Sequence, residues 1–136
     1  MRAISRSAML AVAVGLGLLA GPAAAQTTPS PAFQQRFQAH DKNGDGRIDR
    51  EEFHQWMVEV FYFRDKERKG YLTLEDLKGI GVSTETFKAI NRKGDGKLTL
   101  EEFVNATFRD FEASDTNRDG TLTLEEMQAH ARRARQ

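Results

Sequence analysis

The sequence predicts an all-α fold made of four helix–loop–helix units. Four similar loops begin at residues 41, 65, 91 and 115, and their last residues align as repeats at 47–53, 71–77, 97–103 and 121–127. The segments between the loops carry apolar residues at helical spacing. The loops are called loop 1 (41–52), loop 2 (65–76), loop 3 (91–102) and loop 4 (115–126).

Loop 1 has oxygen-bearing side chains at the spacing that a calcium ion needs. Calcium is a hard cation that takes about six to eight oxygen ligands, and a short loop can wrap it only if alternate side chains point inward. Gly46 permits the sharp turn at position 6, because glycine adopts backbone angles barred to other residues. The expected ligands are Asp41, Asn43, Asp45, the backbone carbonyl of Arg47 and Glu52, with Asp49 acting through water.

Loop 4 repeats the same pattern in full, with Gly120 at the turn. Its expected ligands are Asp115, Asn117, Asp119, the backbone carbonyl of Thr121 and Glu126, with Thr123 acting through water. The alternative for either loop is an acidic, glycine-rich surface turn that holds no metal. Two full matches in a chain of 136 residues favour calcium binding.

Loops 2 and 3 depart from the pattern, so we expect them to bind calcium weakly or not at all. Loop 2 keeps Asp65 but has Lys69 at position 5 and the shorter Asp76 at position 12. An ammonium repels a cation and has no lone pair to offer. Loop 3 keeps Asp95 and Glu102 but has Asn91 in place of the leading Asp and Lys93 at position 3.

With these motifs the chain resembles the EF-hand superfamily, in the compact four-loop, calmodulin-like form of secreted bacterial calcium-binding proteins. The resemblance covers residues 33–127. It implies that the aliphatic residues at position 8 form short strand contacts between paired loops, and that the next apolar residue of each repeat begins an exit helix. The position-8 residues are Ile48, Leu72, Leu98 and Leu122.

Loop spacing predicts which loops pair. Residues 50–64 and 100–114 contain no glycine or proline, so each is expected to be one helix shared by two loops, about 20 Å long. Loops at opposite ends of such a rod cannot touch, so we predict that loop 1 pairs with loop 4 and loop 2 with loop 3. Ser30-Pro31 and Ser83 are predicted to cap two further helices.

The first 25 residues are expected to be a signal peptide, cleaved after Ala25. Arg2 and Arg6 give a positive start, residues 8–20 are apolar, and 23–25 are all alanine. The alternative, a transmembrane anchor, needs about 20 apolar residues. We therefore expect a periplasmic or secreted protein with a tether at 26–32, the EF-hand domain at 33–131 and a basic tail at 132–136.

Composition excludes several other functions. Without Arg2 and Arg6 the chain has 18 basic and 20 acidic residues, which argues against nucleic acid as a partner. It has no cysteine, and its three histidines show no metal-ligand or catalytic spacing, so we do not expect an enzyme. Calcium is the expected cofactor. A calcium sensor or buffer is the predicted role, and an adaptor with calcium as a structural ion is the alternative.

An aromatic run at residues 61–63 is a candidate surface for a protein partner. Phe61 and Phe63 cannot both point to the centre of one apolar stripe. The alternative is that these rings belong to the hydrophobic core, with one of them half-buried.

Overall fold

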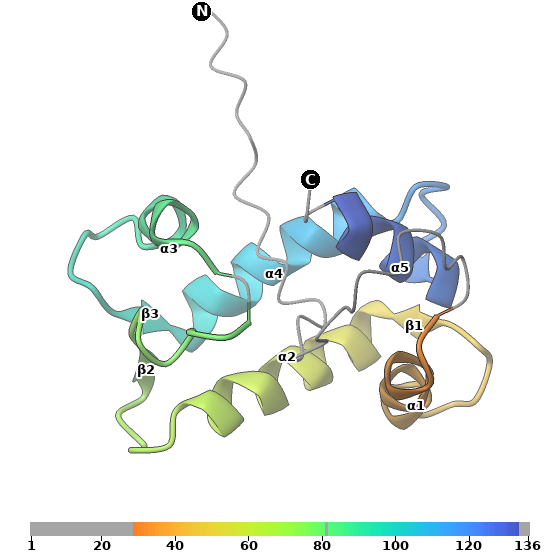
Figure 1. Cartoon of the computed structure of the whole chain (residues 1–136), viewed down its shortest axis with the longest axis horizontal. Helices are drawn as coiled ribbons and strands as arrows, with labels where there is room; N and C mark the ends of the chain where they lie inside the picture. The colour runs from red at the N-terminus through yellow and green to blue at the C-terminus, as the bar shows by residue number, and fades with distance from the viewer. Residues whose placement is uncertain (1–28, 81, 134–136) are drawn as a thin grey trace, which may run out of the picture.

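The computed structural model describes residues 29–80 and 82–133, which form five helices and two small antiparallel sheets (Figure 1). The expected leader lies wholly outside these residues. The start of the expected tether and the end of the expected basic tail also lie outside them. None of the described helices is long and apolar enough to span a membrane. The elements are α1 (Pro31–His40), β1 (Ile48–Asp49), α2 (Arg50–Arg64), β2 (Tyr71–Leu72), α3 (Thr84–Ile90), β3 (Leu98–Thr99), α4 (Leu100–Ser114), β4 (Thr121–Leu122) and α5 (Leu124–Arg133).

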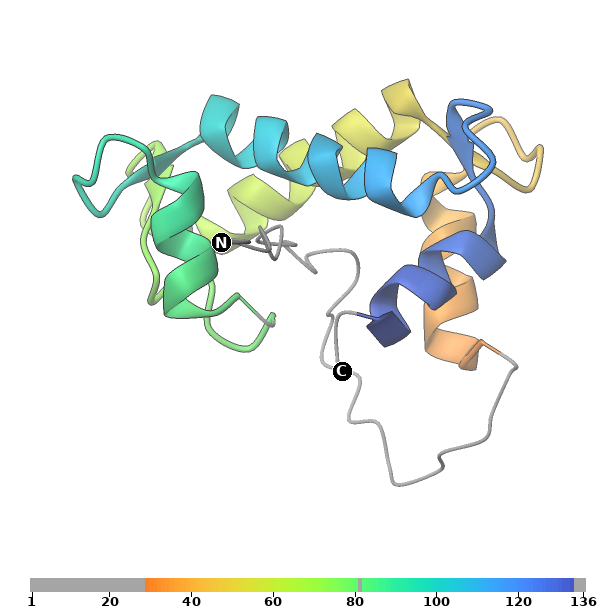
Figure 2. The ribbon, with the colours of Figure 1, turned by 90° about the horizontal axis from the view of Figure 1, so that it is seen from above.

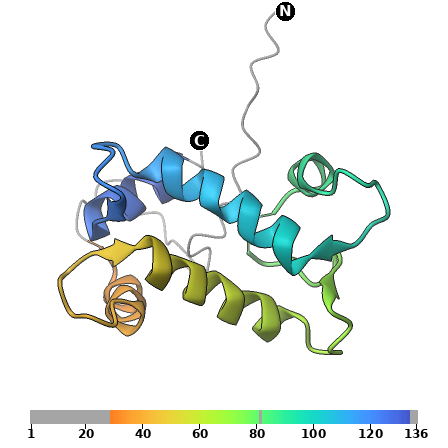
Figure 3. The same ribbon diagram turned by 180° about the vertical axis from the view of Figure 1, so that it is seen from behind.

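Helices α2 and α4 form the centre of the molecule, where they run antiparallel and side by side (Figures 1 and 3). Their ranges are those predicted for the two shared helices. Aromatic rings join them: the ring centroids of Phe53 and Phe111 are 5.0 Å apart, and those of Phe61 and Phe103 are 5.8 Å apart. All four rings are at most 2% exposed, so this seam is the middle of the apolar core.

The loops lie in pairs at the two ends of these rods (Figure 2). Strand β1 of loop 1 pairs with β4 of loop 4, with Ile48 opposite Leu122. Strand β2 of loop 2 pairs with β3 of loop 3, with Leu72 opposite Leu98. The predicted pairing and the two predicted strand contacts are therefore confirmed, and these four aliphatic side chains are fully buried beneath the loops.

The helix caps also follow the sequence. The hydroxyl of Ser30 accepts a hydrogen bond from the backbone N–H of Phe33, and that of Ser83 accepts one from Thr86. Pro31 is the first residue of α1, where its missing N–H costs no helical hydrogen bond.

The segment after loop 2 corrects one expectation. Its apolar residue Leu77 does not begin an α-helix, because residues 74–80 form consecutive turns. Their hydrogen bonds span three residues, as from the N–H of Leu77 to the carbonyl of Leu74 at 3.2 Å. Gly79 has φ +84° and ends these turns, since a helix cannot continue through a left-handed residue. Leu77 is nevertheless fully buried, so the tighter turns still cover the core.

Candidate metal centre

The side chains at positions 1, 3 and 5 of loop 1 are held by the backbone of the loop itself. Asp41 Oδ2 accepts a hydrogen bond from the N–H of Gly46 at 2.8 Å. Asn43 Oδ1 accepts one from the N–H of Asp45, and Asp45 Oδ1 accepts one from the N–H of Arg47, both at 2.9 Å. The turn at Gly46, where φ is +77°, brings these donors inward. The backbone of the loop therefore holds three of the predicted ligand side chains by its own hydrogen bonds.

Glu52 joins the start of loop 1 to its end. Its Oε1 accepts hydrogen bonds from the N–H groups of Lys42 at 2.8 Å and Asn43 at 3.1 Å. Its Oε2 accepts one from the N–H of Asp49 at 3.1 Å, while Asp49 Oδ1 caps α2 by accepting from the N–H of Glu52. Glu52 is 6% exposed. The Glu52 side chain therefore connects the first residues of loop 1 to its last residues, at the position where a calcium ligand is expected.

Loop 4 repeats this network residue for residue. Asp115 Oδ2 accepts from the N–H of Gly120 at 2.8 Å, and Asn117 Oδ1 accepts from that of Asp119 at 3.0 Å. Glu126 accepts hydrogen bonds from the N–H groups of Thr116, Asn117 and Thr123 and from the hydroxyls of Thr116 and Thr123. Burial alone would raise the pKa of Glu126, but these hydrogen bonds outweigh it and lower the pKa. The carboxyl is therefore anionic at neutral pH.

An ion pair joins loops 1 and 4, and no local sequence pattern indicates it. Arg47 Nη1 lies 2.6 Å from Asp119 Oδ2 and 3.2 Å from the hydroxyl of Thr121. The pKa of Asp119 is lowered, chiefly by hydrogen bonds from the hydroxyl and N–H of Thr121 and further by Arg47. The backbone carbonyl of Arg47 is an expected ligand of loop 1. The side chain of Arg47 contacts Asp119, an expected ligand of loop 4.

Loop 2 keeps the backbone network but has a different interior. Asp65 Oδ2 accepts from the N–H of Gly70 at 2.7 Å, as Asp41 does from Gly46 in loop 1. The Lys69 ammonium, however, lies 3.0 Å from Asp76 Oδ2. A positive charge among the acidic groups opposes a second cation there.

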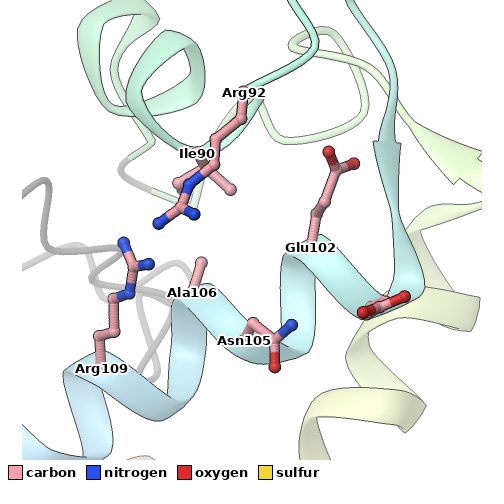
Figure 4. A pocket seen from close by; sticks show the side chains of 7 residues that line it. Ile90, Arg92, Glu102, Asn105, Ala106 and Arg109 are labelled. Atoms are coloured by element: carbon pink, nitrogen blue, oxygen red, sulfur yellow. The ribbon is translucent and has the colours of Figure 1, made fainter.

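Loop 3 has a basic neighbourhood. Its Glu102 accepts a hydrogen bond from the N–H of Thr99 at 3.0 Å and borders a pocket of about 440 Å³. Arg92 and Arg109 point toward one another across this pocket (Figure 4). Two guanidinium groups in the pocket that Glu102 also lines reduce the attraction of this end of loop 3 for a cation. Asn91 and Asp95, the other expected weak ligands, lie in the same loop, and Asp95 Oδ1 accepts from the N–H of Lys97.

The donor sets of loops 1 and 4 fit calcium. Each combines carboxylate, amide and backbone carbonyl oxygens, which are the hard ligands that calcium prefers. Within residues 29–80 and 82–133, no three His, Cys, Asp or Glu side chains converge into a cluster that could hold a metal by themselves. The fit therefore depends on the mixed donor set of each loop, including the Asn side chain and the carbonyl at position 7.

The aromatic run at the end of α2 is split between core and surface. Phe61 is 1% exposed, whereas Tyr62 and Phe63 are 63% and 70% exposed. Phe63 borders a pocket of about 310 Å³, together with Trp56, Val60 and Ile80. The expectation of core with one half-buried ring is therefore corrected, because two rings of the run are exposed.

A comparison with known families matches the chain to the EF-hand domain pair over residues 31–132, which is most of its length. A comparison with curated proteins gives no match.

Proposed function

The chain belongs to the EF-hand domain-pair family, which binds Ca²⁺, and on this premise we propose that loops 1 and 4 are its calcium sites. One observation carries the assignment: only in loops 1 and 4, among the described loops, do Asn at position 3, Asp at position 5 and Glu at position 12 accept hydrogen bonds from the same backbone donors. Strands β1 and β4 pair these two loops. Calcium would supply a divalent charge that neutralises the carboxylates facing each loop. In this proposal the chain has four EF-hand units, with the second and third degenerate.

The proposed role is a calcium buffer or sensor of the periplasm or the extracellular space. Support comes from the leader-like sequence of residues 1–25. Extracellular modules of this type bind calcium at roughly 10⁻⁴–10⁻³ M. At such concentrations the sites would fill outside the cytoplasm, so calcium would order the loop 1–loop 4 end of the molecule.

Calorimetric calcium titration of residues 26–136 tests the two sites. The Glu52→Gln/Glu126→Gln variant should lose two sites, because each substitution removes one anionic oxygen pair. A matched control is Glu51→Gln/Glu125→Gln, which neutralises the neighbouring glutamates that precede each ligand position. Equal loss in the control, or unchanged binding in the first variant, would contradict the assignment.

A second candidate is an interaction module in which calcium is only structural. The exposed Tyr62 and Phe63, beside the pocket near Ile80, favour this reading because large exposed apolar groups often mark interfaces. Fluorescence of an apolar dye distinguishes the two roles. A sensor should gain dye binding when calcium is added, whereas an interaction module should bind dye equally with calcium or chelator and lose that binding in a Phe63→Ser variant.

A further inference from the structure

Loop 2 contains a cation of its own. The ammonium of Lys69 lies 3.0 Å from Asp76 Oδ2 and 3.6 Å from Glu67 Oε2. The side chains of Lys69 and Asp76 are only 20% and 18% exposed. The ring of Tyr71 lies beneath the same ammonium, 5.6 Å from its centroid. The lysine side chain is therefore partly shielded from solvent by its neighbours in the loop.

The backbone of loop 2 nevertheless has the conformation seen in the calcium-type loops. Asp65 accepts hydrogen bonds from the N–H groups of Lys69 and Gly70 at 2.8 and 2.7 Å. Asp115 accepts the equivalent pair from Asp119 and Gly120 in loop 4. The side chains at three ligand positions differ. Position 3 is Glu67 in loop 2 and Asn in loops 1 and 4, position 12 is Asp76 rather than Glu, and position 5 is an ammonium in loop 2 and a carboxylate in loops 1 and 4.

The last position of loop 2 is matched to this ammonium. Asp76 Oδ2 accepts hydrogen bonds from Lys69 Nζ, from the N–H of Thr73 and from its hydroxyl. Burial alone would raise the pKa of Asp76, but these bonds outweigh it and lower the pKa. The shorter Asp leaves room for the lysine head group where a longer Glu would have to share the space. The lysine at position 5 and the aspartate at position 12 thus serve one contact.

We propose that Lys69 is the resident cation of loop 2: it replaces calcium, excludes it, and keeps loop 2 closed without metal. Because β2 pairs with β3, the closed loop also holds loop 3 in place. Lys97 of loop 3 adds a second ammonium over the face of Tyr71, at 4.9 Å from its centroid. The loop 2–loop 3 end is therefore ordered in calcium-free solution, whatever happens at loops 1 and 4.

The exclusion of calcium is tested by a Lys69→Asp/Asp76→Glu variant, which restores an acidic side chain at position 5 and the longer one at position 12. Calorimetry should show one more calcium site than the unaltered chain. The control is Lys66→Asp/Asp76→Glu, which makes the same change of charge at a position that does not face the loop interior. No added site in the first variant, or an added site in the control, would overturn the proposal. The comparison is with the unaltered chain, so it does not depend on loops 1 and 4 binding calcium.

Metal-free closure is tested by amide hydrogen exchange in excess chelator. A Lys69→Met variant keeps the apolar stem and removes the charge, and exchange at Leu72 and Leu98 should speed up about five-fold, the scale of a partly exposed ion pair. Lys69→Arg should restore slow exchange, because it restores the charge. Exchange in Lys69→Met equal to that of the unaltered chain, or unprotected strands in the unaltered chain itself, would show that Lys69 does not close the loop.

Discussion

A buried carboxyl in the middle of α4 gives a stability prediction that depends on pH. Asp110 is 4% exposed, and its Oδ2 has no hydrogen-bond partner among the described residues. Burial raises the pKa of Asp110 from 3.8 to about 8. The unfolded chain has no such burial, so there the same carboxyl ionises near its ordinary pKa.

The sign and size of the effect follow from that difference. Between about pH 4 and pH 8 the native carboxyl stays protonated while the unfolded one is ionised, so unfolding releases a proton and stability falls as pH rises. At 1.36 kcal/mol per pKa unit, the penalty reaches about 6 kcal/mol above pH 8 and is about 2 kcal/mol at pH 5.5. An Asp110→Asn variant cannot titrate, so its stability relative to the unaltered chain should increase by about 3–4 kcal/mol between pH 5.5 and pH 9.

Urea denaturation at pH 5.5, 7 and 9 in saturating calcium measures this difference. The control is Glu112→Gln on the same helix, where the side chain is 63% exposed and lies 3.5 Å from Arg50. The control should show little dependence on pH over this range. A stability difference for Asp110→Asn that stays constant from pH 5.5 to pH 9 would refute the reasoning, because it would mean that the native carboxyl is already ionised.

Three further predictions concern the paired loops and the central seam. Arg47→Gln should tighten calcium binding at loop 4 about two- to five-fold, since Asp119 is then free of the competing guanidinium; calorimetry measures this, with Arg50→Gln as the control. Gly46→Ala should destabilise the chain by about 1 kcal/mol in thermal unfolding, because φ of +77° strains any residue with a Cβ. Phe53→Ala should cost about 3–5 kcal/mol of unfolding free energy, because its ring is 2% exposed between two helices.

The parts of the fold that the sequence predicted are those set by local signals and rod length. Ser30 and Ser83 are the predicted helix caps, and their hydroxyls accept hydrogen bonds from the N–H groups of Phe33 and Thr86 at the starts of α1 and α3. No glycine or proline interrupts α2 or α4, so their length was readable. The pairing of loops then followed from geometry alone, because a rigid rod keeps its two ends apart.

The parts that the sequence missed depend on contacts between distant residues or on a balance of weak terms. The ion pair of Arg47 and Asp119 joins residues 72 positions apart, and nothing local to either residue indicates it. The turns after loop 2 replace an α-helix because Gly79 ends the segment early, although the repeat pattern around Leu77 matches the other units. The burial of Asp110 depends on which face of α4 the neighbouring helices cover. The local sequence around Asp110 does not indicate that this side chain is buried.

Charge explains why the two ends of the molecule would need different cations. Loops 1 and 4 together contain nine acidic and four basic residues, whereas loops 2 and 3 contain seven acidic and six basic residues. The strand pairs bring each set together at one end of the α2–α4 rods. Carboxylates crowded at the first end repel one another, and this repulsion favours uptake of a divalent ion. At the second end the lysines and arginines nearly balance the acidic residues, so pairing would need no external charge. In loop 2, the sign of the side chain at position 5 would thus decide whether the repeat depends on calcium.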